Sequence, residues 1–385
     1  MRVGLITNLP GLEALNARGA ADAPLDTIFA AIGGNSGNIA YVAGTRRVLA
    51  NTILTIDWST PDEVVRTGCD VVVIACANQL GAHADLTDWA VKLERLKLPV
   101  VLIGLGAQAV AKDSPVPLTP GTRRFLEVVQ SLRPDPRTPN IALRGEFSRS
   151  VLEAHGGEGV ALGCPSLFLN FDPALGAQIS AAARRKVGSG FTFAVGNPYL
   201  ASSVAAEITL SALAHARGAR CIVQHPREMM ALATGNAHLL PEAKIEFIRE
   251  RMLPRHSTDD FLAWTRAFWD LHLDISSWIA SVRSSGRVVG ARYHGVALGA
   301  QAGVPACVVA IDARTLELAE TGCMPHVDVA EAAALADIHG VDDLWTPEHG
   351  ERFDAHRAGL AGRLADFLRA QNLTPSENLK ALARA

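Results

Sequence analysis

Residues 71–105 read VVVIACANQLGAHADLTDWAVKLERLKLPVVLIGL and decide the fold class. The stretch opens with the apolar run 71–78, continues through a longer segment of helical periodicity, and closes with a second apolar run from Pro99. Short apolar runs are typical of buried strands, and a helical segment between two of them is typical of a βαβ unit in a parallel sheet. The stretch therefore predicts an α/β fold.

The same alternation extends along the chain in both directions. Before residue 171 the apolar runs are VGLIT, ILTIDW, VVVIACAN, PVVLIGLGAQ, NIALRG and GVALGCPSLF. From residue 191 the pattern starts again with FTFAVGNPYL, ARCIVQHPRE, RVVGARYHG and VPACVVAID. We therefore predict two Rossmann-like, doubly wound domains that face a shared cleft, where the carboxyl ends of the strands would hold a ligand.

The domain boundary is predicted at residues 171–190, which lose the strand pattern, become polar and basic, and end in glycine-rich sequence. This linker separates an N-terminal α/β domain at 1–170 from a C-terminal α/β domain at 191–347. Residues 348–385 form a C-terminal helical segment in this prediction, because apolar side chains recur there at helical spacing. A chain of 385 residues is long enough for two domains.

Composition excludes several functional classes. Hydrophobic residues make up 49% and charged residues 19%, which is typical of a globular protein, and the net charge of −3 gives no field that would attract nucleic acid. The six cysteines are scattered without a CxxC pair, so we expect reduced core cysteines and no metal. We find no signal-peptide pattern and no apolar stretch able to span a bilayer, so we expect a cytoplasmic protein without an integral membrane segment.

The first candidate motif is GGNSGN at residues 33–38, which precedes a helical segment. Glycines let the main chain approach a ligand, and N–H groups at a helix start attract anions. Asn35 and Asn38 can donate to sugar hydroxyls or phosphate. A tight turn with a helix cap is the structural alternative, but two Asn and three Gly in six positions favour a ligand site.

A second glycine motif, GLGAQA at residues 104–109, matches the GxGxxA pattern of dinucleotide-binding proteins. That pattern also needs an acidic residue at the end of the next strand, roughly 20 residues on. The corresponding region, TPGTRRFLEVV, looks like the start of a helix instead. We therefore expect no nicotinamide cofactor.

Two further stretches follow predicted strands. In LRGEFS, Arg144 ends a strand, where its guanidinium can hold a carboxylate or phosphate in a bidentate fork. An ion pair with a nearby acid such as Glu146 is an equally good interpretation. In LGCPSL we expect only a loop that ends the first domain, because nothing in the local sequence marks Cys164 as an activated thiolate.

The strongest candidate is VVGARYHG at residues 288–295, followed by an apolar strand and Asp312-Ala313-Arg314. Arg292 and His294 stand two apart on a segment predicted to be extended, so they point to one side and can reach one ligand. Arg292 and Arg314 suit an anion, whereas His294 titrates near neutral pH and suits proton transfer. Polarity at the end of an apolar strand is costly to bury without a task, which favours function.

Other candidates have weaker support. Asn197 and His225 end predicted strands of the second domain, although isolated polar residues there are more often turn formers. Aromatic residues recur at helical spacing before the strongest motif and are predicted to be core: Trp264, Phe268, Trp269 and Trp278.

In order, GNSGN, GLGAQ, LRGEFS, GCPS, ARYHGVALGAQAGVP and DARTLELAE resemble the polysaccharide pyruvyl transferase family over about residues 30 to 325. The resemblance implies a GT-B-like fold and transfer of pyruvate from phosphoenolpyruvate to two sugar hydroxyls, which gives a cyclic ketal and inorganic phosphate without metal or cofactor. It implies a bacterial enzyme of exopolysaccharide or capsule synthesis that acts on a sugar or lipid-linked sugar. Peripheral membrane association and homo-oligomerisation stay open.

The resemblance also implies roles for particular residues. Arg144 and Arg292 would hold the donor's anionic groups, His294 would act in acid–base catalysis, and the acceptor side would be lined by Asn35, Gly37 and Asn38. To these we add a catalytic acid, either Asp312 or Glu146. The remaining candidates are Arg314, Glu317 and Asn197 on the donor side and Gln108 on the acceptor side.

Two other functions are compatible with the sequence. A glycosyltransferase that uses a nucleotide sugar would occupy the same kind of two-domain fold, with Glu317 on the ribose. A non-catalytic protein that binds a glycan precursor would keep the cleft but would not need both Arg292 and His294.

Overall fold

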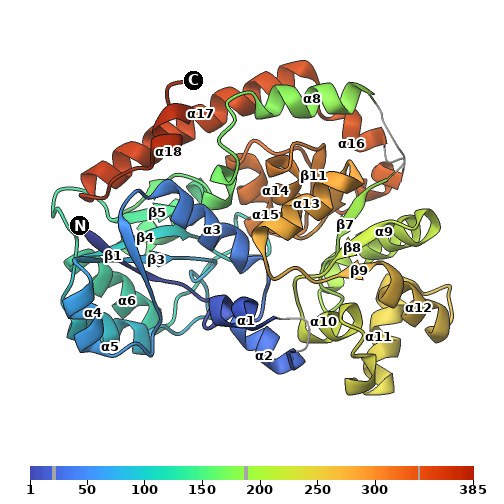
Figure 1. The fold of residues 1–385 in the computed structure, drawn as a ribbon, viewed down its shortest axis with the longest axis horizontal. Coiled ribbons are helices and arrows are strands. Elements are labelled where there is room, and N and C mark those ends of the chain that lie inside the picture. The colour runs from blue at the N-terminus through green and yellow to red at the C-terminus, as the bar shows by residue number, and fades with distance from the viewer. Residues whose placement is uncertain (20–22, 186–189, 337–338) are drawn as a thin grey trace.

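The computed structural model describes residues 1–19, 23–185, 190–336 and 339–385. Within these ranges the chain forms two six-stranded sheets with helices packed around them (Figure 1). All neighbouring strands in both sheets run parallel. The predicted α/β class with two Rossmann-like sheets is confirmed.

The first sheet has the strand order β2-β1-β3-β4-β5-β6, with Val3 of β1 opposite Ile53 on one side and Val71 on the other. Its strands are β1 (Arg2–Ile6), β2 (Thr52–Ile56), β3 (Val71–Ala75), β4 (Val100–Leu105), β5 (Ile141–Leu143) and β6 (Val160–Ala161). Its helices are α1 (Leu12–Arg18), α2 (Leu25–Ala31), α3 (Asn38–Val48), α4 (Asp62–Gly68), α5 (Thr87–Leu96), α6 (Pro120–Ser131), α7 (Glu146–Ala154) and the 3₁₀ helix η2 (Pro165–Phe168). Every residue of β3 and β4 is buried, which is why they read as uninterrupted apolar runs.

The second sheet has the order β12-β11-β10-β7-β8-β9. Its strands are β7 (Thr192–Ala194), β8 (Arg220–Ile222), β9 (Trp269–Asp270), β10 (Val288–Gly290), β11 (Ala306–Ala310) and β12 (His326–Asp328). The elements around it are η3 (Ala201–Ser203), α9 (Val204–Arg217), α10 (Arg227–Ala233), η4 (Ala237–Leu239), α11 (Glu242–Met252), α12 (Thr258–Phe268), α13 (Ile275–Ser285), α14 (Tyr293–Gln301), α15 (Ala313–Thr321), η5 (Glu331–Ala336) and α16 (His339–Asp343).

The predicted linker at 171–190 contains helix α8 (Leu175–Arg185), and its residues 186–189 lie outside the described residues. Helix α8 is packed against α17 (Pro347–Ala370), with the Asp354 carboxylate accepting hydrogen bonds from the Gly176 and Ala177 amides at 2.6 and 3.0 Å. The two sheets separate between β6 and β7, and the domain limits stay a prediction.

The predicted C-terminal helix is confirmed as α17, which Thr346 caps and α18 (Glu377–Leu382) follows. Figure 1 shows α17 running from the second sheet back across the molecule beside α8. The chain then joins the first half, where the Ala50 amide donates to the Thr374 carbonyl and the Ser376 amide donates to the Val48 carbonyl. The last elements therefore tie the two halves together.

Core predictions can be compared directly with burial. Trp264, Trp269 and Trp278 are buried, as predicted, whereas Phe268 is only partly buried. All six cysteines are free, and five of them are buried.

Helix α6 occupies the region where a dinucleotide-binding protein would need a strand with an acidic end, as expected. No helix in the described part of the chain is long and apolar enough to cross a membrane.

Candidate functional site

The strongest sequence motif lies where the second sheet meets the first half of the chain. Strand β10 ends at Gly290, Arg292 is the extended N-cap residue of α14, and His294 is the second residue of that helix. The predicted extended Arg-x-His segment is therefore wrong. At Gly290, the last residue of β10, φ is 154° and the main chain lies so close to β7 that a Cβ would be 2.1 Å from the Ala194 oxygen.

Two arginines at the starts of α14 and α15 form the cationic side of the site. Arg292 donates through Nη2 to the His225 carbonyl at 3.1 Å, and its buried Nε has no partner among the described residues. Arg314 pairs with Asp312 at 3.2 Å. Burial, and then the charge of Arg314, lowers the pKa of Arg292 to about 10. A bound anion would relieve this repulsion between two cations.

His294 lies between the two halves. Its Nε2 is 3.5 Å from the Cys164 Sγ, and its ring is 5.7 Å from the ring of Tyr41 in α3. Burial, followed by the charges of Arg144 and Arg314, lowers the pKa of His294 well below its ordinary value. Burial and these charges therefore favour the neutral imidazole, which has one ring nitrogen free to accept a proton.

The turn at residues 33–38 faces His294. The Asn35 side chain accepts from the Gly37 amide at 2.8 Å, and the Ser36 amide donates across to the Gln224 carbonyl at 3.1 Å. A Cβ on Gly37 would lie 2.6 Å from the Gln224 Oε1 and 3.2 Å from the His294 Nδ1. Glycine is thus needed at position 37 for close approach, and the turn lies against the second half.

Asn38, proposed from the sequence for the acceptor side, has a different environment. It is 7% exposed, and its amide nitrogen donates to the Ile32 and Gly33 carbonyls at 2.9 and 3.4 Å. These bonds close the turn and begin α3. An acceptor contact by Asn38 stays a prediction, and its described contacts are those of a residue that holds the turn.

Arg144 is near the site but is buried, with 2% of its surface exposed. Its Nε donates to the Gly104 carbonyl at 2.9 Å and its Nη2 to the Cys76 carbonyl at 3.3 Å, while its guanidinium lies 5.5 Å from the Tyr41 ring centre. Glu146, the sequence alternative as its partner, pairs with Arg149 instead. Arg144 therefore contributes charge close to His294, with two of its donors committed to the main chain.

The other predicted residues have partners of their own. Asp312 caps α15, and Asn197 accepts from the Tyr199 amide at 3.1 Å. The Gln108 side chain accepts from the Asn78 side chain. Buried Glu317 accepts from the Ser148 amide and hydroxyl at 2.6 and 2.7 Å, and burial raises the pKa of this carboxyl. Glu317 thereby ties α15 to α7, and none of these bonds involves Arg292 or His294.

Two buried residues that we did not select from the sequence lie next to the site. Gln224 is 2% exposed and stands between Gly37 and Gly295, with its amide nitrogen unpartnered among the described residues. Glu207 of α9 accepts from the Gly196 amide at 3.0 Å, and burial raises the pKa of Glu207 to about 7 against the opposing charge of Arg292. Gln224 directly precedes His225, which the sequence had indicated as a candidate. Glu207 lies inside a helical pattern, and nothing in the neighbouring sequence distinguishes it from a surface glutamate.

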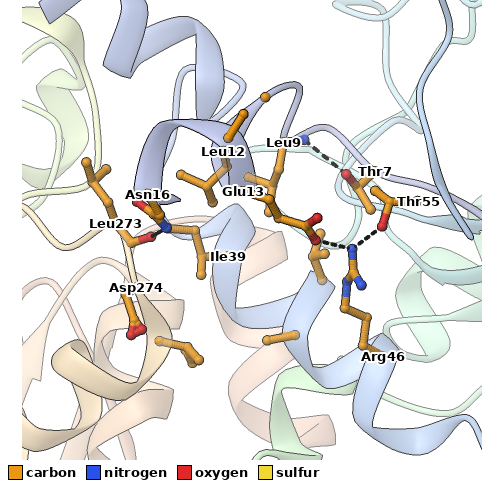
Figure 2. Close-up of a pocket in the computed structure, with 15 residues that line it drawn as sticks. Thr7, Leu9, Leu12, Glu13, Asn16, Ile39, Arg46, Thr55, Leu273 and Asp274 are labelled. Atoms are coloured by element: carbon orange, nitrogen blue, oxygen red, sulfur yellow. Dashed lines mark hydrogen bonds and ion pairs between the residues drawn. The ribbon is translucent and has the colours of Figure 1, made fainter. Parts of the chain in front are cut away.

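A cavity of about 520 Å³ opens beside α3, between the loop after β1, helix α1 and the segment before α13 (Figure 2). Leu12 and Ile39 give it apolar walls. At its edge Arg46 pairs with Glu13 at 2.6 Å, and the Asn16 amide donates to the Leu273 carbonyl at 3.0 Å. The cavity is therefore bounded by both halves and lies on the helix that begins at the GNSGN turn.

No curated protein sequence matches the chain. Similar solved structures include S. aureus MnaA with UDP, at 10% identity and a TM-score of 0.47, covering 97% of this chain and 99% of that one. Anabaena HepE with UDP and glucose has 12% identity and a TM-score of 0.47, covering 96% and 99%.

A putative UDP-N-acetylglucosamine 2-epimerase from Listeria monocytogenes is similar at 12% identity and a TM-score of 0.44, covering 96% of this chain and 97% of that one. The family model for polysaccharide pyruvyl transferase matches residues 35–313. This match begins in the GNSGN turn and ends just before Arg314, so it includes Arg144, Arg292 and His294. The chain belongs to the polysaccharide pyruvyl transferase family and is a transferase.

Proposed function

We propose that the protein transfers pyruvate from phosphoenolpyruvate to two hydroxyls of a sugar, free or lipid-linked, during cytoplasmic synthesis of an exopolysaccharide or capsule. The observation that carries this proposal is the junction at His294. Arg292 and Arg314 each have a buried Nε without a partner among the described residues, and His294 follows Arg292 by two residues in the first turn of α14. The charge of Arg314 also lowers the pKa of Arg292. Phosphoenolpyruvate offers a carboxylate and a phosphate, which two guanidinium groups can bind together.

The proposed chemistry uses His294 to move protons. The first sugar hydroxyl attacks C2 of the enol, and its proton passes through His294 to C3, so that one molecule of alcohol is added across the double bond. The second hydroxyl then attacks C2, the C2–O bond to phosphate breaks, and the released proton leaves with the phosphate. Arg292 and Arg314 would stabilise the negative charge on the donor throughout.

The acceptor is proposed to approach from the GNSGN turn. In this turn Asn35 accepts from the Gly37 amide, and Gly37 lies close to His294. The cavity beside α3 is lined by Ile39, which follows this turn in sequence, and combines apolar walls with carboxylate, amide and guanidinium groups at its edge. Those are the groups that bind the apolar faces and hydroxyls of sugars. We propose that further parts of the acceptor occupy this cavity.

Ligand-induced thermal stabilisation tests the donor. A ligand that binds only the native state stabilises it by about 2.7 kcal/mol when present at about 100 times its Kd. We expect phosphoenolpyruvate to raise the Tm and Arg314→Gln to abolish the increase. Arg124→Gln is the matched control, because Arg124 pairs with Glu94 on the surface. Stabilisation by UDP-glucose without any response to phosphoenolpyruvate would contradict the proposal.

A further inference from the structure

Helix α15, which carries Arg314, is bonded to the first half of the chain through Glu317. Glu317 is 2% exposed, and its two carboxylate oxygens accept from the Ser148 amide at 2.6 Å and from the Ser148 hydroxyl at 2.7 Å. Ser148 is fully buried and lies in the first turn of α7. The two residues are 169 positions apart in the sequence, so this contact joins the two halves.

Main-chain groups fix the geometry of this contact. The Ser148 amide is among the first four N–H groups of α7, which have no acceptor in their own helix, and Glu317 supplies the acceptor. The Ser148 oxygen accepts in turn from the Ala107 amide at 2.9 Å. Because a hydroxyl has two lone pairs and one hydrogen, Ser148 can bond to the Glu317 Oε2 whichever of these two oxygens carries the proton. The pairing therefore holds for the charged and for the neutral carboxyl.

Gly145 leaves the space into which Glu317 fits. A Cβ on Gly145 would lie 2.5 Å from the Glu317 Cγ and 2.5 Å from the Thr321 Oγ1. The φ of Gly145 is 179°, which is extended backbone, so glycine is needed here for close packing and not for its conformation. Gly145 and Ser148 of the LRGEFS motif thus form the place where α15 meets the first half.

The start of α15 is also held by the first half. The Ala313 amide donates to the Ala109 and Val110 carbonyls, at 3.2 Å each, in the loop after β4. Arg314 comes directly after Ala313 and three residues before Glu317, so Arg314 and Glu317 are neighbours on the surface of the helix. Arg314 therefore lies between two attachments of α15 to the first half.

The same contact is close to a second arginine of the site. Arg144 lies four residues before Ser148, and the charges of Arg144 and Arg314 both act on the imidazole of His294. Separation of α15 from α7 would leave the buried Glu317 carboxyl without either donor, which is costly. The bonds between Glu317 and Ser148 therefore join the segments that carry the two arginines.

We propose that Glu317 is a positioning residue whose bonds to Ser148 hold α15, and with it Arg314, against the first half before any ligand binds. Charges that are already in place need no rearrangement when an anion enters. That this anion is phosphoenolpyruvate rests on the proposed function, whereas the attachment of α15 is a property of the chain itself. Glu317, expected from the sequence on the donor side, acts on the donor through Arg314 in this proposal.

Amide hydrogen exchange tests the attachment without ligand or turnover. In Glu317→Ala we expect the Ala313 amide to exchange at least about 10-fold faster, while the central strand β3 changes less, because a helix that opens locally loses its protection first. Glu317→Gln should restore native exchange, since its amide oxygen can accept from the Ser148 amide and its nitrogen can donate to the Ser148 oxygen.

Glu320→Ala is the matched control. Glu320 lies on the same helix and also bonds across the halves, to Lys112, but both side chains are exposed and such a pair contributes little. Exchange in α15 should therefore stay native. Gly145→Ala removes no hydrogen-bonding group but displaces Glu317, so it should reproduce the faster exchange of Ala313 and serves as the test if Glu317→Ala does not fold.

Two results of the exchange experiment would overturn the proposal. Native exchange of Ala313 in both Glu317→Ala and Gly145→Ala would show that the contact does not hold the helix. Equal acceleration of α15 and β3 would show that Glu317 only stabilises the fold as a whole.

Calorimetry with phosphoenolpyruvate tests the consequence for Arg314. We expect Glu317→Ala to raise the Kd about 10-fold, and Glu317→Gln and Glu320→Ala to keep the native Kd. An unchanged Kd in Glu317→Ala would overturn the proposal, because Arg314 would then bind equally well from a helix that is no longer held. Absence of binding to the native chain would refute the proposed function, but the exchange rates would still decide whether Glu317 attaches α15.

Discussion

Gly37→Ala is the sharpest perturbation of the site that leaves the backbone unchanged. Gly37 has φ −58° and ψ −20°, a conformation open to any residue, so only the added methyl group matters. That methyl would lie 2.6 Å from the Gln224 Oε1 and 3.2 Å from the His294 Nδ1. Both distances are shorter than the separation of about 3.5–4.0 Å at which non-bonded atoms attract.

The free-energy cost of the added methyl group depends on whether the neighbouring side chains can move away from it. Gln224 is 2% exposed, so its side chain has little room to move away, and its main-chain carbonyl is fixed by the Ser36 amide. Overpacking of this kind costs about 1–3 kcal/mol. The loss of turnover should be larger in proportion, because a displacement of about 1 Å in a reacting group can reduce the rate about 100-fold.

Urea unfolding and phosphate release from phosphoenolpyruvate measure the two effects. Adding Gln224→Ala to Gly37→Ala should recover part of the stability but little turnover, since the contact with His294 remains. Gly359→Ala in α17 is the control, because no atom lies within 4 Å of its Cβ, and it should stabilise the helix by about 0.5–1 kcal/mol without affecting turnover. Wild-type stability and turnover in Gly37→Ala would refute the geometry of the turn.

Three other substitutions test separate parts of the site. His294→Gln should fold normally and lose about 10²–10⁴-fold in turnover, and near-normal turnover would remove His294 from the mechanism. Arg292→Lys should weaken phosphoenolpyruvate binding measured by calorimetry, because an ammonium cannot form a bidentate fork; unchanged affinity would make Arg292 structural. Burial raises the pKa of Glu207 from 4.5 to about 7, so the folded state binds the extra proton between these values and stability should fall by about 3 kcal/mol as the pH rises through this window. Glu207→Gln should abolish that decline in urea unfolding, and an unchanged pH dependence would contradict the burial of a neutral carboxyl.

The sheets were predictable because burial on both faces leaves a signal in the sequence itself. β3 and β4 are apolar at every position, and a run of this kind has few alternatives once Gly and Pro bound it. The turn at 33–38 was found for a similar reason, since its glycines mark a backbone that meets other groups closely. These features could be predicted because the residues that determine them are neighbours in the sequence.

Pairings across the two halves were not predictable from local patterns. Cys164 and His294 are 130 residues apart, and the sequence around the cysteine indicates only a loop. Glu207 looks like any helical glutamate, and its carboxyl is distinctive only because Gly196 and Arg292 lie beside it in the fold. The placement of His294 on a helix was missed because the short β10 ends at Gly290, whose contact with Ala194 is also nonlocal.

The hydrogen bonds between the two halves of the chain affect which half we expect to contact the donor and which the acceptor. The GNSGN turn belongs to the first half by sequence, yet the Ser36 amide bonds to Gln224 and the Gly34 carbonyl to the His225 ring. At the other end of the junction, Glu317 is bonded to Ser148, and separating these buried groups would leave a carboxyl without its two donors. The turn is therefore bonded to the second half at Gln224 and His225, and the His225 carbonyl also accepts from Arg292. We therefore expect the donor and acceptor contacts to be divided among the loops at this junction rather than between the two halves of the chain.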